Sequence, residues 1–243
     1  EKIVDSFNDS RFKYYKKVNG GVSSARNFGL LLAKGKYVNF FDSDDLACLN
    51  HLLEAYNFFS SNKNANVVIF DYEWGNVDKL KYRIITNKYK DLNRAIIKEN
   101  FISTNSIFIK KTSADKVTFN EKLTISEDWE YWLKLSLFNK LYAVNIVTSY
   151  IVEHQQRGLN HINIDHLIKQ KDIFISSLKN CKSLQLKDIN SINAHFSSFI
   201  ALNAAIVSNK KIAISYFFKS FQLSKNSIFS RRSLAIIKHL LIK

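Results

Sequence analysis

The 243-residue sequence has no proline and no methionine, and it has only two cysteines and six glycines. Cys48 and Cys181 are far apart and fit no metal-ligand spacing, so neither a disulfide framework nor a zinc site is expected, and a cytoplasmic setting is favoured. Long apolar runs are also missing, because none approaches the roughly 18 residues of a membrane-spanning helix. The first residues do not show the pattern of a secretory signal peptide.

Acidic residues are scarce relative to basic ones. The chain has 36 Lys and Arg against 21 Asp and Glu, a net charge of +15. The excess is largest in residues 181–243, where Asp188 is the single acid among ten basic residues. A basic tail suggests an anionic partner, such as membrane headgroups, nucleic acid or an acidic polymer. Simple solubility explains the charge equally well.

Hydrophobic residues make up 46% of the chain, enough for a sizeable core in one or two domains. Apolar runs predict strands over residues 11–18, 36–41, 66–74, 105–111 and 141–154. Helical spacing predicts helices over 25–34, 49–60 and 126–138, with Ser23 or Ser24 capping the first, Gly35 following it, and Ser126 capping the last. The alternation of strands and helices predicts an α/β fold with a parallel sheet.

Strand patterns stop beyond about residue 162. Ile192, Phe196 and Ile200 recur at helical spacing, and so do apolar residues within 234–241. The sequence therefore predicts an α/β domain over residues 1–160 and a helical, basic C-terminal region over residues 161–243.

Three aspartates directly follow the predicted strand 36–41. Asp42, Asp44 and Asp45 would lie at the carboxyl end of that strand, where ligands bind in parallel α/β sheets. Their oxygens could hold a hard divalent cation that bridges to a diphosphate. The alternative is structural, with the aspartates forming an Asx-turn that caps the next helix.

The whole run from Asn19 to Asp45 resembles the inverting glycosyltransferases of family 2, which use nucleotide sugars and have the GT-A fold. Their pattern is N-x-G-x-S-x-A-R-N-x-G followed by A-x-G-x-Y-[IV]-x-F-x-D-x-D-D. The matching positions are Asn19, Gly21, Ser23, Ala25, Arg26, Asn27, Gly29, Ala33, Gly35, Tyr37, Phe40, Asp42, Asp44 and Asp45. The resemblance implies a GT-A (Rossmann-like), mostly parallel sheet flanked by helices.

The resemblance also implies roles for the residues of this first motif. Asp42, Asp44 and Asp45 would bind the donor, with Asp44 as the main ligand and Asp42 as a further ligand of a Mn²⁺ or Mg²⁺ cofactor. Arg26 would lie near the nucleotide base. Alternatively, Arg26 forms a salt bridge that fixes a loop, and the sequence favours neither role over the other.

Glu127 and Asp128 form a second motif at the start of the predicted helix 126–138. An inverting transferase needs a base that takes the proton of the acceptor hydroxyl. By resemblance to the family's E-D pair, Asp128 would be that base and Glu127 would position it. Acids in a first helical turn also complement the helix dipole, which is the structural alternative. The neighbouring Trp129 and Tyr131 could contribute to an acceptor platform.

A third candidate lies after the last predicted strand. Family members often carry a His or Arg there that touches the diphosphate, and His154 and Arg157 stand at the matching place. A surface loop with polar residues is an equal alternative.

The family pattern normally opens with a strand ending in P-x-Y-N and a second ending in D-D-G-S, and neither appears in this sequence. Residues 1–17 instead match the family's helix end and third strand, which come after D-D-G-S. Together with the absent initiator methionine, this predicts a GT-A domain that is incomplete at its N-terminal side.

The implied function is transfer of a sugar from a nucleotide-diphosphate donor, with a UDP-sugar expected, to a saccharide or lipid-linked acceptor in bacterial surface polysaccharide synthesis. Residues 190–223 are expected to pack on the catalytic body. Residues 228–243 are expected to lie peripherally on the inner face of the membrane. Two other classes stay open: a metal-dependent nucleotidyltransferase, which lacks its Gly-rich loop here, and a non-catalytic nucleic-acid-binding protein. No nucleic-acid-binding motif is recognisable, so nucleic acid is not an expected partner.

Overall fold

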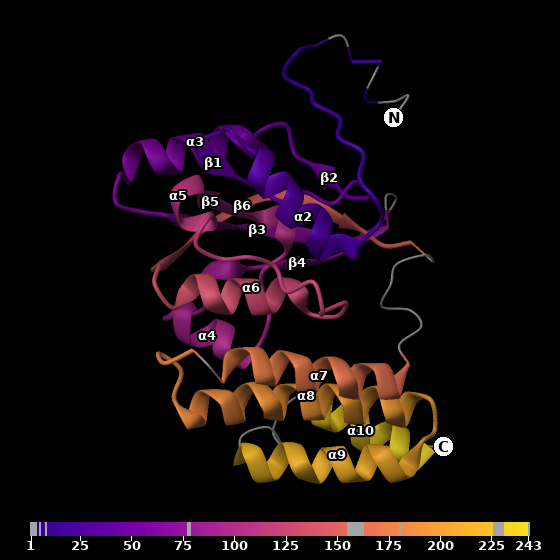
Figure 1. Cartoon of the computed structure of the whole chain (residues 1–243). Helices are drawn as coiled ribbons and strands as arrows, with labels where there is room; N and C mark the ends of the chain where they lie inside the picture. Colours follow the sequence, from indigo (N-terminus) through magenta and orange to yellow (C-terminus); the bar gives the residue numbers. More distant parts are fainter. Residues whose placement is uncertain are drawn as a thin grey trace.

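The computed structural model describes residues 4, 6–7, 9–76, 79–154, 163–179, 181–225 and 231–242. Its helices and strands alternate up to Val152, and only helices follow in the described part of the chain (Figure 1). The elements are α2 (Gly21–Leu32), β1 (Tyr37–Val38), β2 (Leu46–Ala47), α3 (His51–Ser61), β3 (Val67–Asn76), β4 (Lys79–Ile84), η1 (Thr86–Lys88), α4 (Leu92–Lys98), η2 (Thr104–Ser106), β5 (Ile107–Lys110), α5 (Lys111–Ala114), α6 (Glu127–Ser136), β6 (Leu141–Val152), α7 (Ile164–Leu178), α8 (Leu186–Ile206), α9 (Lys210–Leu223) and α10 (Arg231–Ile242).

The sheet is built around β3, whose first residues alternate between two cores. Val67 and Ile69 face the larger core, which also contains apolar side chains of α2, α4 and α6. Val68 and Phe70 face the smaller core, where they pack with Ala55 and Phe59 of α3. Because successive side chains of a strand point to opposite faces, one apolar strand holds helices on both sides of the sheet.

The predicted α/β fold is confirmed, but the sheet is mixed and not mostly parallel. The strand order is β1-β5-β3-β6-β2, with β4 paired to β3 beside β5. Among the described strands only β3 and β6 are parallel, while the β1–β5, β3–β5, β3–β4 and β2–β6 pairs are antiparallel. The prediction was wrong on this point because it assumed a crossover between every pair of neighbouring strands. A short connection such as that from β3 to β4 permits only antiparallel pairing.

Two local predictions near the beginning of the chain were wrong. Residues 11–18 form no strand: their side chains are all exposed and they pair with no described strand. β-propensity alone does not form a strand that has no neighbour to bond with. The helix begins at Gly21, before Ser23 and Ser24, and ends at Leu32, before Gly35. Asn19 supports its start, since the Asn19 side chain accepts a hydrogen bond from the Gly21 amide (3.0 Å).

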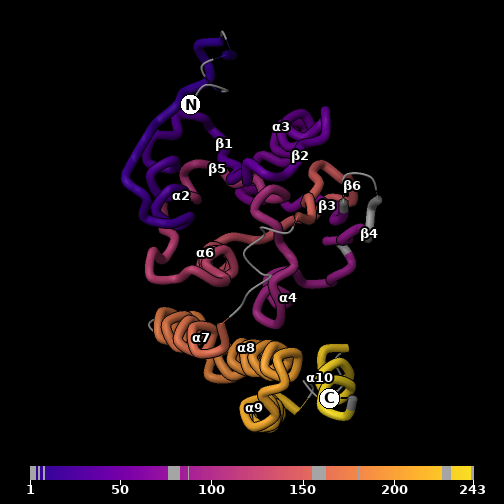
Figure 2. Tube along the Cα trace, turned by 90° about the vertical axis from the view of Figure 1, so that its right-hand side faces the viewer, coloured from indigo at the N-terminus to yellow at the C-terminus, as the bar shows by residue number. Residues whose placement is uncertain are grey.

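The C-terminal helices stack against the α/β body beneath α4 and α6 (Figures 1 and 2). Phe174 of α7 and Ile192 and Phe196 of α8 are buried in the same core as the residues of α6. α9 packs on α8 through the fully buried Ala213. The predicted boundary at residue 160 lies outside the described residues. No helix in the described part of the chain is long and apolar enough to span a bilayer.

Candidate active site

A cavity of about 1270 Å³ lies where the two acidic motifs meet. Two helices, α2 and α8, and the strand β3 contribute lining residues. Others come from the loop that follows β1, from the segment before η2, from the start of α6 and from the end of β6. The predicted site residues that line it are Arg26, Asp42, Asp44, Asp45, Glu127, Asp128 and His154. Arg157 lies outside the described residues. Segments about a hundred residues apart in the sequence therefore contribute to one pocket.

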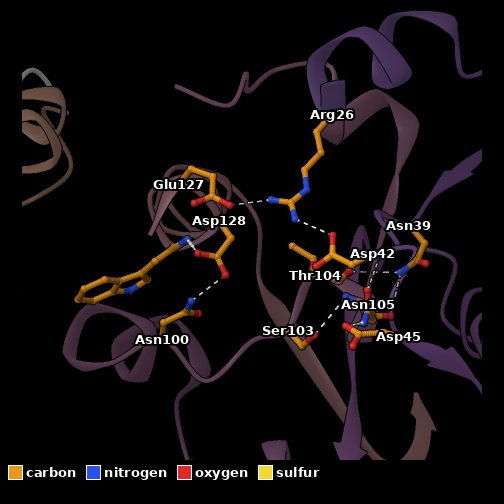
Figure 3. Close-up of polar contacts among 11 residues, drawn as sticks. Arg26, Asn39, Asp42, Asp45, Asn100, Ser103, Thr104, Asn105, Glu127 and Asp128 are labelled. Carbon is orange, nitrogen blue, oxygen red and sulfur yellow. Dashed lines mark hydrogen bonds and ion pairs between the residues drawn. The ribbon is translucent and has the colours of Figure 1, made fainter. Parts of the chain in front are cut away.

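Asp42 is held on three sides. Its Oδ1 accepts a hydrogen bond from Arg26 Nη2 (2.8 Å), and its Oδ2 accepts one from Thr104 Oγ1 (3.2 Å). Its backbone amide donates to Asn105 Oδ1 (2.8 Å). Figure 3 shows these contacts around the carboxylate. The orientation of Asp42 is thus fixed by α2 and by η2.

Asp45 has a structural environment. Only 9% of the residue is exposed, its Oδ2 accepts from Asn105 Nδ2 (2.6 Å), and its Oδ1 accepts from the Val152 amide (2.9 Å). It therefore joins the loop after β1 to η2 and to the end of β6. Asp45 does not cap α3, because the N-cap residue of that helix is Asn50. Since Asp45 also lines the cavity, its contact with the donor stays a prediction.

Asp44 differs from its two neighbours because its side chain is 46% exposed in the cavity wall. Its Oδ2 lies 2.9 Å from Nε2 of His154, which follows β6. The pair offers one carboxylate and one imidazole at the cavity surface. His154 thus lies beside the first motif, and its contact with the diphosphate stays a prediction.

Arg26 connects the two motifs. Its Nη2 bonds to Asp42, and its Nη1 donates to Glu127 Oε1 (2.9 Å), with only 11% of the Arg26 side chain exposed. Burial on its own lowers the pKa of Arg26, but the charges of Asp42, Glu127 and Asp128 outweigh it and raise that pKa. The salt-bridge reading of Arg26 is therefore what the structure shows, and a contact with a nucleotide base stays a prediction.

The start of α6 has an unusual backbone. Ser126 stands at the N-cap with φ 60° and ψ 26°, the left-handed conformation that non-glycine residues rarely adopt, and its side chain makes no capping bond. The acids of the first turn, Glu127 and Asp128, follow it and complement the helix dipole. Such backbone strain is common at functional sites, where neighbouring contacts hold it in place.

Asp128 is oriented by two hydrogen bonds. Its Oδ2 accepts from Asn100 Nδ2 (3.0 Å) and its Oδ1 from the Trp129 amide (2.7 Å), as Figure 3 shows. Removal of the carboxyl group from water, and secondarily the charge of Glu127, raises its pKa to about 6, although these hydrogen bonds and Arg26 act in the opposite direction. A carboxyl group with this pKa is suited to accept a proton near neutral pH.

Trp129 and Tyr131 do not form the acceptor platform that the sequence predicts. Trp129 and Tyr131 are buried, since the Trp129 Nε1 donates to the Ile96 carbonyl oxygen and the Tyr131 hydroxyl donates to that of Ala114. Tyr72 and Trp74 of β3 line the cavity instead. Their spacing of two along an apolar strand was the available signal, because it places both on one face. No pattern in the sequence indicated that Asn100 and Thr104 would line the cavity.

The acidic residues fit a hard divalent cation only as a partial ligand set. Asp44 and Asp42 offer the carboxylate oxygens that Mn²⁺ or Mg²⁺ prefers, and His154 adds a nitrogen. The described residues include no group of three or more such side chains that could hold a metal ion by themselves. A cation here would therefore take further ligands from a bound diphosphate or from water, as Mg²⁺ commonly does.

Comparison with known proteins connects this site to one family. The family model "Glycosyl transferase family 2" matches residues 1–117. An uncharacterized glycosyltransferase of Methanocaldococcus jannaschii is 24% identical over 189 residues, 75% of this chain and 60% of that protein. The minor teichoic acid biosynthesis protein GgaB of Bacillus subtilis is 34% identical over 119 residues, 47% of this chain and 13% of that protein.

A third relative is the poly(ribitol-phosphate) beta-N-acetylglucosaminyltransferase TarP of Staphylococcus aureus. It is 29% identical over 160 residues, 64% of this chain and 49% of TarP. The crystal structure of S. aureus TarS 1–349 matches with a TM-score of 0.61 at 15% identity, covering 93% of this chain and 70% of that one, which shows a shared fold. The chain spans less than two thirds of the length of the curated relatives named here.

Proposed function

The chain belongs to glycosyl transferase family 2 and has the GT-A fold, and we propose that its cavity catalyses inverting transfer of a sugar from a nucleotide-diphosphate donor to an acceptor hydroxyl. The observation that carries the proposal is the bridge by Arg26. It places the donor-side carboxylate Asp42 and the α6 pair Glu127 and Asp128 on the wall of one cavity.

The proposed chemistry depends on Asp128. Its carboxylate takes the proton of the acceptor hydroxyl as that oxygen forms a bond to the anomeric carbon. The bond from that carbon to the diphosphate oxygen breaks, and the leaving diphosphate takes the electron pair. Attack opposite to the leaving group inverts the configuration. Asn100 and the Trp129 amide hold the carboxylate in place, and Glu127 acts through Arg26.

The donor is proposed to bind on the Asp42 and Asp44 side of the cavity, with a UDP-sugar as the first donor to test. Asp44 and Asp42 would hold a Mn²⁺ or Mg²⁺ ion, which supplies positive charge to the departing diphosphate. His154, next to Asp44, is placed to interact with the same diphosphate. Asp45 supports this side by fixing the loop.

The acceptor is proposed to be a polyol-phosphate or saccharide chain of a bacterial surface polysaccharide. The named activities of TarP and GgaB support this choice, since both concern polymers of that kind. Tyr72 and Trp74 lie in the cavity wall, and the charge of Asp128 contributes to raising the pKa of Tyr72 after the larger effect of burial. Tyr72 lines the same cavity as the proposed base, and we propose that it stacks on a sugar or polyol.

Peripheral contact with the inner face of the membrane is proposed for α10. Ser233 and Ile236 are fully buried, so one face of this helix packs on the protein. Leu234, Ile237 and Leu241 are 68%, 40% and 80% exposed on other faces, and Lys238 is exposed beside them. An exposed apolar surface with basic neighbours suits an anionic bilayer interface.

The proposal is tested with a thermal-shift screen of the full chain against nucleoside diphosphates and their sugars, with and without Mn²⁺. Ligand binding to the native state raises the unfolding temperature by mass action. We expect a shift for one diphosphate and its sugar that needs the metal, followed by diphosphate release when a ribitol- or glycerol-phosphate oligomer is added. Stabilisation by oligonucleotides alone, falling steeply with salt, would contradict the proposal.

A further inference from the structure

A second cavity, of about 840 Å³, lies between α4, α8 and α10. α8 contacts both α4 and α10; in Figure 2 it lies below α4, with α10 at its side. The cavity shares no lining residue with the candidate active site. Its lining includes five basic residues and two acids: Arg94, Lys98, Lys187, Arg231, Arg232, Glu99 and Asp188.

Both acids of this cavity are already engaged. Asp188 accepts from Arg94 Nη1 (3.2 Å) through Oδ1 and from the Gln185 amide (3.0 Å) through Oδ2. Glu99 accepts from the Tyr89 hydroxyl (2.6 Å). Because five basic residues face two acids in the lining, the cavity keeps an excess of positive charge.

Arg232 is held in a fixed position at the cavity wall. Its Nη1 donates to the His195 carbonyl oxygen (3.2 Å) and to Ser198 Oγ (3.0 Å), and its Cζ lies 5.5 Å from the centre of the Phe199 ring. Within the described chain no carboxylate lies at ion-pair distance from Arg232. This contrasts with Arg26, whose guanidinium is paired with two carboxylates.

The surroundings make an anion at Arg232 favourable. Burial lowers the pKa of Arg232 more than the charge of Glu99 raises it, so the guanidinium is partly removed from water and the charge of Glu99 compensates this only in part. Burial and then the charge of Arg232 lower the pKa of His195 to about 3, so this imidazole is neutral at physiological pH. Arg231 and Arg232 are the first two residues of α10, which adds the positive end of a helix dipole at the cavity.

We propose that this cavity binds a phosphate group, with Arg232 as the oriented ligand and Arg231, Lys187 and Lys98 supplying further positive charge. Three of the five N–H donors of Arg232 face His195 and Ser198, including Nη2 at 3.5 Å from His195 Nε2. The remaining Nε–H and Nη2 hydrogens form a fork that matches the geometry of two phosphate oxygens, and the surrounding lysines add charge without fixed geometry. A single phosphate monoester or diester fits the excess charge. Phosphate binding here does not depend on the proposed sugar transfer.

One side chain is shared by the surroundings of the proposed phosphate site and of the candidate active site. Phe199 lines the first cavity and lies under the Arg232 guanidinium. The ring of His195 is 4.8 Å from that of Trp129, the residue that follows Asp128. Phe199 of α8 therefore connects the proposed phosphate site with the wall of the sugar-transfer cavity.

The test is titration of the full chain with inorganic phosphate by calorimetry at constant ionic strength. We expect saturable binding that Arg232→Gln weakens by at least about tenfold. Lys211→Gln removes the same charge at an exposed position of α9 outside the cavity, and we expect less than a twofold change. Should Arg232→Gln fail to fold, the double variant Lys187→Gln with Arg231→Gln, both exposed on the rim, is expected to give a similar loss.

Two further arms identify the source of the phosphate. Glycerol 3-phosphate represents soluble phosphate esters, and phosphatidylglycerol vesicles, compared with phosphatidylcholine vesicles, represent lipid headgroups. The ligand whose binding Arg232→Gln weakens identifies the source of the phosphate. Equal phosphate affinity of the native chain and the cavity variants, or an equal loss in Lys211→Gln, would overturn the proposal.

Discussion

Arg26 and Glu127 are joined by an ion pair of 2.9 Å across 101 positions of the sequence, with 11% and 14% of their side chains exposed. Because Arg26 also binds Asp42, this pair holds the donor side of the cavity against α6. The shape of the candidate active site therefore depends on a buried charge network and not only on apolar packing.

The first prediction concerns that network. Arg26→Gln leaves Asp42 and Glu127 without their counter-charge, and we expect a loss of about 2–4 kcal/mol in the free energy of unfolding, as for other buried pairs that lose one partner. Urea denaturation measures it. Arg11→Gln is the control, because Arg11 is 88% exposed and Asp9 31% exposed in their pair, and we expect a much smaller loss of stability there. Equal losses in the two variants would refute a special role for Arg26.

The second prediction is a pH dependence. Asp128 can accept a proton only when ionised, so kcat/KM should fall as the pH drops through its pKa of about 6. Asn100 donates a hydrogen bond that favours the ionised form, so Asn100→Ala raises the pKa and should move this acidic limb upward by up to about one pH unit.

The pH–rate profile checks this prediction. Asn62→Ala serves as the control, because Asn62 is an exposed residue at the end of α3 and is outside the cavity. An acidic limb that stays in place in an active Asn100→Ala variant would show that another group is the base.

The third prediction separates two adjacent aspartates. Asp44→Asn should leave the fold intact and abolish Mn²⁺-dependent donor binding, since Asp44 is half-exposed in the cavity. Asp45→Asn should instead lower stability by about 1–3 kcal/mol, because its new NH₂ group faces the Asn105 or Val152 donor. Thermal unfolding with and without nucleotide and metal distinguishes them. Native nucleotide affinity of Asp44→Asn with Mn²⁺ present would exclude the metal assignment.

The fourth prediction tests the membrane contact of α10. The double variant Leu234→Ser with Leu241→Ser removes exposed apolar area and leaves the buried Ile236 in place. We expect the native chain to sediment with anionic vesicles, less so at high salt, and the variant to lose most of that binding. Unchanged partitioning of the variant would mean that α10 does not contact the bilayer.

The grouping of the site residues could be predicted from the sequence, because motifs that follow strands or begin helices tend to meet at one edge of an α/β sheet. Arg26, Asp42, Asp44, Asp128 and His154 line the same cavity, as that reasoning requires. The different environments of the three aspartates could not be predicted. They depend on Asn105 and on the Val152 amide, which only the folded chain brings to Asp45.

The fold shows the same division between local and long-range information. Helices and strands with strong apolar periodicity were predicted well, as β3 and α6 illustrate. Strand direction depends on pairing partners, which a local pattern does not encode, so the mixed sheet was missed. Trp129 and Tyr131 were misassigned because aromatic residues early in a helix can face either a ligand or a core, and here both face the core.

The most direct test of the account is single-turnover sugar transfer by Asp128→Asn compared with the native chain, with the donor affinity measured in parallel. The substitution keeps the size of the side chain and removes its capacity to take a proton. We expect donor affinity within about twofold of native and a transfer rate lower by roughly 10²–10⁴-fold, the usual effect of losing a general base. A near-native transfer rate in this variant would contradict the assignment of Asp128 and with it the proposed mechanism.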